Sequence, residues 1–242
     1  LYNYMSQILV ELIKFANLIL NITKSIACAG RISQVLDTSS SMTDGADALP
    51  AGEGQPALQF ADVSFRYPEA GADALTGISF SAAAGQTIGI IGGTGSGKST
   101  LANLIPRFYD ATGGQVLVRG ADVKTLRLQA LRPCIGVVPQ KALLFSGTIR
   151  ENLRWGSADA SDEALWQALR AAQAEQVVLD KPGGLDAGVE PGGRNFSGGQ
   201  RQRLTIARAL VRKPDILILD DSASALDFAT DAALRKALAA LP

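Results

Sequence analysis

Eight consecutive residues decide the fold of this chain: Gly92-Gly93-Thr94-Gly95-Ser96-Gly97-Lys98-Ser99. They follow a short apolar run at residues 87–91 and lead into a helix-compatible stretch at 100–107, which predicts a strand, a loop and a helix. The glycines allow the loop backbone to wrap a phosphate with its N–H groups inward, and the start of the helix favours an anion. Lys98 would reach the β- and γ-phosphates, and the Ser99 hydroxyl would bind Mg²⁺. The pattern therefore predicts a nucleotide-binding P-loop.

The composition excludes several classes of function. The 242 residues, 47% of them apolar, can bury a full core and suggest one or two domains. Lys plus Arg and Asp plus Glu number 23 each, so no basic surface for nucleic acid is expected. The chain has no histidine, which excludes acid–base catalysis and metal sites built on that residue. Cys28 and Cys134 are too far apart for a Cys-x-x-Cys site and are expected to be buried or incidental thiols of a protein with cytosolic parts.

Residues 1–36 predict one long helix, because they contain no proline and only one glycine. Leu1 is not an initiator Met and no signal-peptide pattern follows, so we expect an excerpt of a longer chain. Apolar side chains form one stripe, and polar side chains recur three, four or seven residues apart in another: Asn3, Gln7, Lys14, Asn17, Asn21 and Lys24. This periodicity leaves three alternatives open: a soluble amphipathic helix, a membrane helix with one face toward a polar cavity, and an interfacial helix.

The rest of the chain reads as a linker followed by alternating strands and helices. Residues 37–57 are small, polar and punctuated by Gly and Pro, which is typical of a linker. Strands are predicted around 63–67, 78–81, 115–118 and 135–138, and a buried parallel strand at 216–219. Helices are predicted at 148–180, with Ser161 as an internal N-cap, at 199–211 and at 228–241.

Two further groups of residues carry chemistry. Asp220 and Asp221 close the strand predicted at 216–219, where a P-loop protein needs a carboxylate for the Mg²⁺ shell and, at the next position, an acid that orients water. Ser197-Gly198-Gly199-Gln200 stands at the start of a basic helix, where exposed N–H groups and a hydroxyl could bind a phosphate.

Residues 195–203 match a family signature motif. The chain from 58 to 242 resembles the nucleotide-binding domain of ABC transporters, and its detailed sequence resembles the exporter branch. The resemblance implies an α/β fold of the P-loop NTPase class, with a RecA-like core, an antiparallel β subdomain and a helical subdomain at about 141–212. It further implies that 1–36 is the end of the last transmembrane helix with its cytoplasmic extension, that 37–57 is the linker, and that 58–242 stops before the family's switch histidine.

The resemblance also assigns roles to individual residues. Tyr67 would stack on adenine, Gln140 would sense Mg²⁺ and contact the transmembrane coupling helices, and Glu190 would belong to the exporters' coupling loop. Ser224 to Asp227 would cross a dimer interface. The resemblance assigns Mg²⁺ binding to Ser99, Gln140 and Asp220, and catalysis to Lys98, Gln140 and Asp221. The implied ATP-binding residues are Tyr67, Gly92, Gly93, Thr94, Gly95, Ser96, Gly97, Lys98, Ser99, Thr100, Ser197, Gly198, Gly199, Gln200 and Asp227.

One residue departs from the family pattern. Competent members carry Glu after the Mg²⁺-binding aspartate, whereas this chain has Asp221. The missing methylene withdraws the carboxylate by about 1.5 Å, and a displacement of about 1 Å can cost roughly 10²-fold in rate. We therefore expect an ATPase whose own site hydrolyses weakly. Such a substitution is typical of one subunit of a heterodimeric exporter, in which the intact Ser197–Gln200 signature would serve the partner's competent site.

The predicted protein is thus an ATP-binding subunit of an exporter in the cell or inner membrane, with a cytoplasmic nucleotide-binding domain. Its expected partners are a second half-transporter, the coupling helices, membrane lipid around residues 1–36, and an exported small molecule or lipid. Two alternatives remain: a soluble ABC ATPase of DNA repair or translation, against which the apolar helix and neutral charge speak, and a non-hydrolysing module that uses ATP to hold a dimer closed. P-loop kinases are excluded because the Ser-Gly-Gly-Gln signature has no role in them.

Overall fold

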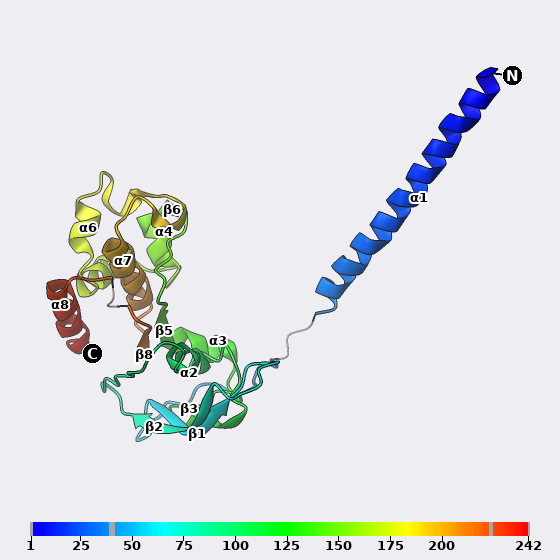
Figure 1. Cartoon of the computed structure of the whole chain (residues 1–242). Coiled ribbons are helices and arrows are strands. Elements are labelled where there is room, and N and C mark those ends of the chain that lie inside the picture. The colour runs from blue at the N-terminus through cyan, green and yellow to red at the C-terminus, as the bar shows by residue number, and fades with distance from the viewer. Residues whose placement is uncertain (1, 39–41, 223–224, 242) are drawn as a thin grey trace. The chain divides into compact units, whose positions relative to one another are not determined.

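The computed structural model describes residues 2–38, 42–222 and 225–241 (Figure 1). It divides into two compact units, residues 1–43 and 44–242, and each is described by itself. Ser224, predicted to lie at a dimer interface, and Ser39 to Ser41 of the predicted linker fall outside the described residues.

The first unit contains one helix, α1 (Tyr2–Leu36), which confirms the predicted helix. Thirty-five residues at about 1.5 Å each give a helix longer than the ~30 Å hydrocarbon layer of a bilayer. The helix is long and apolar enough to cross a membrane by length and composition. Lys14 donates to Glu11 at 2.8 Å, and the Thr23 and Ser25 hydroxyls donate to carbonyls one turn back, so these polar groups are satisfied within the helix.

An antiparallel sheet opens the second unit. Its strands, β1 (Leu58–Phe65), β2 (Leu75–Ala82), β3 (Gly113–Val118) and β4 (Ala121–Asp122), lie in the order β2-β1-β3-β4. The register of β1 shifts between Phe60 and Val63, where Asp62 adopts a positive φ of 50°. This bulge turns both Phe60 and Val63 into the core, although residues three positions apart face opposite sides of a regular strand.

Part of the segment predicted as a linker is ordered against this unit. The Leu128 N–H at the start of α3 (Leu128–Leu131) donates to Asp44 Oδ1 at 2.8 Å, and Asp47 forms a parallel bridge with Leu126. Leu49 packs against the apolar cluster beneath the antiparallel sheet. The chain from Asp44 onward therefore belongs to the second unit.

A parallel pair of strands, β5 (Ile135–Val138) and β8 (Ile216–Leu219), confirms both strands predicted there. The strand predicted at residues 87–91 is wrong, because these residues form no strand and Ile91 is 98% exposed. A strand needs a neighbour for its backbone N–H and C=O groups, and none of the described strands pairs with this segment. The helix that follows the P-loop, α2 (Lys98–Leu104), is present, and a 3₁₀ turn (Arg132–Cys134) leads into β5.

The segment predicted to be helical at 148–180, with an internal cap at Ser161, forms three helices: α4 (Ile149–Arg154), α5 (Asp162–Ala171) and α6 (Glu175–Leu179). The break before α5 includes Gly156, whose Cα lies against the Arg208 carbonyl, and the break after it includes Gln173, which has a positive φ of 56°. The predicted cap at Ser161 is confirmed, since its hydroxyl accepts from Ala164 N.

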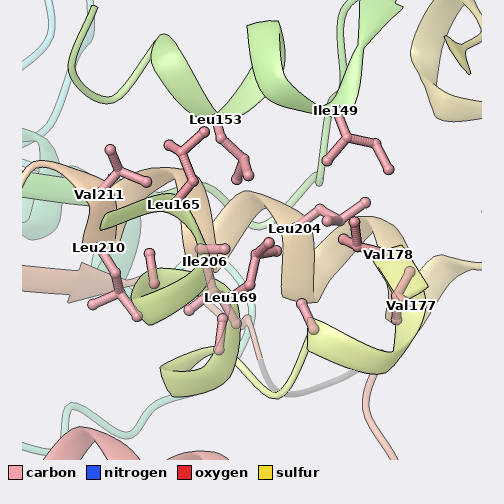
Figure 2. Packing of buried hydrophobic residues seen from close by; sticks show 14 of the residues in the cluster. Ile149, Leu153, Leu165, Leu169, Val177, Val178, Leu204, Ile206, Leu210 and Val211 are labelled. Atoms are coloured by element: carbon pink, nitrogen blue, oxygen red, sulfur yellow. The ribbon is translucent and has the colours of Figure 1, made fainter. Parts of the chain in front are cut away.

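These helices pack around α7 (Gly198–Val211). Figure 2 shows side chains of α4, α5 and α6 meeting α7 in one buried cluster, in which Leu165, Leu169 and Ile206 are each 0% exposed. A short ribbon of β6 (Gly147–Thr148) and β7 (Gly188–Val189), with 3₁₀ turns at Gly184–Asp186 and Pro191–Gly193, lies in the same half of the unit. The last helix, α8 (Phe228–Ala239), adds Leu234 to the cluster.

Replacing Leu169 by alanine should destabilise this unit by about 2–5 kcal/mol, because a fully buried leucine leaves a cavity that its neighbours fill only in part. Urea unfolding followed by circular dichroism measures the change. Leu179→Ala is the matched control, because Leu179 is 58% exposed on α6 and its loss should change the free energy of unfolding by less than about 0.5 kcal/mol. Equal effects of the two substitutions would contradict the packing shown in Figure 2.

Candidate functional site

The P-loop is built on glycines, and two of them, Gly92 and Gly97, leave no room for a side chain. Gly95 and Gly97 have φ angles of 81° and 87°, a region that other residues avoid. A Cβ on Gly97 would stand 2.8 Å from the Ala74 carbonyl oxygen and 2.8 Å from Leu75 Cδ2. A Cβ on Gly92 would likewise meet the Ser96 hydroxyl at 2.5 Å. The glycines thus permit both the turn and its close approach to the start of β2.

Lys98 folds back into the loop, where its ammonium donates to the carbonyls of Gly92 and Gly93 at 2.7 Å each and lies 3.5 Å from Ser96 Oγ. Gly97 caps α2, and its carbonyl accepts from Leu101 N at 2.9 Å. The ammonium charge therefore lies within the loop, beside the start of α2. That arrangement suits the phosphates of a nucleotide.

Tyr67 lies beside this helix, as its predicted role requires. Its hydroxyl is 3.0 Å from the hydroxyl of Thr100, and its ring packs edge-on against Phe65 and Tyr109, with centroid distances of 4.8 and 5.3 Å. Packing of Tyr67 against the core is compatible with its predicted base-stacking role, since the ring is only partly buried.

The carboxyl ends of β5 and β8 bring three predicted residues together. Asp220 N donates to Val138 O at 3.0 Å, which holds the two strand ends side by side. Gln140 Nε2 donates to Asp221 Oδ2 at 3.2 Å, across 81 residues of sequence. Asp221 itself has a positive φ of 48°. The predicted Mg²⁺ ligands Gln140 and Asp220 and the predicted catalytic Asp221 thus share one edge of the parallel pair.

The signature residues start α7 through a reciprocal cap. The Ser197 hydroxyl accepts from Gln200 N at 3.2 Å, and Gln200 Oε1 accepts from Ser197 N at 2.9 Å. Gly199 lies close beneath the Ala225 carbonyl, where a Cβ would be 3.0 Å from the oxygen. The signature and the described part of the predicted interface loop are therefore in contact.

Asp227 caps the next helix. Its carboxylate accepts from the Thr230 N–H at 2.9 Å and from the Thr230 hydroxyl at 2.7 Å. These hydrogen bonds hold the pKa of Asp227 below its ordinary value. Glu190 is exposed at the start of the 3₁₀ turn Pro191–Gly193, and its N–H donates to Asn195 Oδ1 at 3.1 Å. The geometry of the described residues leaves the predicted coupling role of Glu190 untested.

An aromatic groove of about 300 Å³, which the sequence did not predict, lies where α4 and α7 end. Phe145 and Trp155 stack there with centroids 4.8 Å apart, and the Arg208 guanidinium lies 5.8 Å from the Phe145 ring. Burial lowers the pKa of Arg208, and its Nη1 is buried without a hydrogen-bond partner in the described part of the chain. A tryptophan directly before Gly156 in a polar helix was the signal that could have pointed to this surface.

Comparison with known proteins identifies the domain that carries this site. The model of the ABC transporter family matches residues 75–224, which include the P-loop, Gln140, the signature and both aspartates. The chain belongs to the ABC transporter family. It is 44% identical, over 98% of its length, to the uncharacterised ABC transporter ATP-binding protein YfiB of Bacillus subtilis, and 40% identical, over 89%, to an ATP-dependent lipid A-core flippase of Chromobacterium violaceum.

A solved structure of a bacterial Atm1-family ABC exporter with ATP bound is also similar. The match covers 91% of this chain and 39% of the exporter chain, with a TM-score of 0.82 and 34% sequence identity. The match confirms the P-loop NTPase fold. The chain spans 41% of YfiB and 36% of the flippase, about two fifths of the length of these ABC relatives.

The side chains of this ABC domain fit Mg²⁺ and ATP. The glycine cradle admits phosphates, and hydroxyl, carboxylate and amide oxygens are the donors that Mg²⁺ takes beside phosphate oxygens. Among the described residues, no cluster of three or more His, Cys, Asp or Glu side chains is placed to hold a metal ion.

Gly97→Ala should weaken Mg·ATP binding by about tenfold or more, because a left-handed conformation costs an alanine about 1–2 kcal/mol and its Cβ would press on Ala74 and Leu75. Isothermal titration measures the affinity. Gly89→Ala is the control, since a Cβ there meets nothing within 4 Å. An unchanged affinity in Gly97→Ala would contradict the described loop geometry.

Proposed function

We propose that this chain is the ATP-binding and ATP-hydrolysing part of a membrane exporter. One observation carries the proposal: the similarity to YfiB covers 98% of the chain, so it includes α1 as well as the second unit. A P-loop domain directly preceded by a helix long enough to cross a bilayer suits a protein that couples ATP to transport. The second unit would then lie in the cytoplasm, where ATP is available.

The polar stripe of α1 supports export rather than simple anchoring. Gln7, Lys14 and Asn17 recur on one side of the helix, and polar side chains within a membrane helix turn away from lipid. In the assembled exporter this stripe would line a polar cavity. The cargo would be a small molecule or a lipid, consistent with the flippase named among the relatives.

The partner would be a second half-transporter, because the P-loop and the signature of one ABC domain are expected to serve two different sites. In that arrangement the P-loop of this chain pairs with the partner's signature, and Ser197 to Gln200 pair with the partner's P-loop. The capped start of α7 presents the backbone N–H groups of Gly198 and Gly199, where a Cβ on Gly198 meets nothing within 4 Å. The surface is therefore open to a phosphate from a neighbouring chain.

Asp221 makes the partner a different protein rather than a copy of this chain. Its carboxylate hydrogen bonds with Gln140, and its side chain starts from a backbone with a φ of 48°. A carboxylate that is one methylene short and turned toward Gln140 is poorly placed to orient water at a γ-phosphate. The site at this chain's P-loop would bind ATP and hydrolyse it slowly, while the signature completes a competent site on the partner.

Asp221→Glu should raise the ATP turnover of the assembled transporter, by up to roughly 10²-fold at this site, because the longer side chain restores the reach of the carboxylate. Steady-state phosphate release from the purified complex measures it. Asp221→Asn should not raise turnover, since an amide cannot accept a proton from water.

Asp159→Glu is the matched control, because it makes the same change at an exposed position between α4 and α5. Unchanged turnover in Asp221→Glu would argue that this site limits hydrolysis for another reason. Full hydrolytic activity of the unaltered chain in both sites would favour a homodimer, and no hydrolysis in any variant would favour the ATP-held dimerisation module.

The aromatic groove would receive a coupling helix of the transmembrane part. Its Phe145 lies five residues after Gln140, the residue assigned to coupling-helix contact, and the groove combines exposed rings with cationic groups. No ion pair among the described residues involves Arg132, Arg208 or Arg212. An apolar side chain packed on the stacked Phe145–Trp155 pair, with an acidic or carbonyl group facing Arg208, would fill the groove.

Trp155→Ser should release the docked helix, because it removes one of the two stacked rings. Hydrogen–deuterium exchange of the full-length protein should then become faster at residues 143–156, while Mg·ATP affinity stays unchanged. Leu179→Ser is the control, since Leu179 is similarly exposed on α6, away from the groove. Identical exchange in the wild type and the Trp155 variant would rule out docking at this surface.

A further inference from the structure

Tyr67 is tied to the P-loop helix by its hydroxyl group. Tyr67 Oη and Thr100 Oγ1 lie 3.0 Å apart, a hydrogen bond between residues 33 positions apart in sequence. Thr100 occupies the first turn of α2, two residues after Lys98, and is 8% exposed. A tyrosine hydroxyl at a partly buried position needs such a partner. One bond therefore joins the aromatic ring to the helix that carries the phosphate-binding lysine.

Two other rings fix the plane of Tyr67. The Phe65 ring, from the end of β1, meets it at 83°, and the Tyr109 ring, from the segment after α2, meets it at 84°. Both are edge-to-face arrangements, which aromatic pairs favour. Phe65 and Tyr109 also contact each other, with centroids 5.5 Å apart. The rings set the tilt of Tyr67, and the Thr100 bond sets how far its tip reaches along α2.

We propose that the Thr100 hydroxyl is a positioning group for the nucleotide base, acting through Tyr67. The inference rests on the proposed binding of ATP with its base on the Tyr67 ring. A ring already held in place loses less conformational entropy when a base stacks on it than a ring free to rotate. Because Thr100 belongs to the phosphate-binding helix, the position of the base contact is then fixed relative to the phosphate contacts.

This role differs from direct contact between Thr100 and phosphate. If Thr100 contacted phosphate, removing its hydroxyl would weaken the binding of nucleotides and of bare polyphosphates alike. A group that acts through Tyr67 affects only ligands with a base. The ratio of ATP affinity to tripolyphosphate affinity therefore separates the two roles, and a change in fold stability alone would not move that ratio.

The test titrates the full-length protein with Mg·ATP and with Mg·tripolyphosphate, for Thr100→Val, Tyr67→Phe, the double variant and Thr100→Ser. Each single variant should lower ATP affinity by about two- to tenfold, the effect of one lost hydrogen bond, and leave tripolyphosphate affinity unchanged. The double variant should be no weaker than either single one, and Thr100→Ser should retain wild-type affinity. Thr125→Val, which removes a hydroxyl bonded to Asp122 O, is the matched control and should change neither affinity.

Parallel losses of ATP and tripolyphosphate affinity, or additive losses in the double variant, would overturn the inference. Tyr67→Phe keeps the ring and decides the question by itself if Thr100→Val does not fold. If the wild type does not bind ATP, or if Tyr67→Ala does not lower ATP affinity, the proposed nucleotide site itself is wrong. If the wild type binds ATP, Tyr67→Ala lowers ATP affinity and Tyr67→Phe leaves it unchanged, only the role of Thr100 is overturned.

Discussion

The nucleotide site depends on the contact between Gly97 and the start of β2. A single carbon added to Gly97 would collide with the Ala74 carbonyl and the Leu75 side chain, so the last turn of the P-loop lies directly on the antiparallel sheet. From there α2 buries Leu101 and Leu104 in the same apolar cluster as Phe60 and Val63 of β1. The loop therefore has a rigid floor although residues 87–91 before it are exposed.

The parallel pair β5 and β8 connects this floor to the helical part of the domain. Ile135 and Ile218 pack into the cluster beneath the antiparallel sheet, whereas Val138 and Leu217 pack into the cluster around α7. In Figure 1 the two strands run between these groups of elements. Gln140, Asp220 and Asp221 follow directly at their ends, so any shift between the two clusters changes the geometry of these polar groups first. The predicted Mg²⁺ ligands Gln140 and Asp220 therefore lie where the two clusters meet.

Local patterns predicted most of the site, because its parts depend on residue type over short distances. The P-loop follows from glycines with positive φ, and the signature cap follows from Ser197 and Gln200 three residues apart. The failures are non-local. Whether residues 87–91 form a strand depends on a neighbour, which their own composition cannot report, and the Tyr67–Thr100 bond and the aromatic groove join positions that only folding brings together.

The cap on α7 explains how the signature can be both structural and functional. The Ser197 hydroxyl uses a lone pair to accept from Gln200 N, and a hydroxyl has one hydrogen to donate besides its two acceptor lone pairs. The Gln200 side chain is turned back to Ser197 N, and the first N–H groups of the helix, at Gly198 and Gly199, have no acceptor within the helix. The same hydrogen bonds that fix the helix start therefore hold its remaining donors in a set direction. In the proposed dimer, a phosphate from the partner chain would meet donors already ordered, and little conformational entropy would be lost on contact.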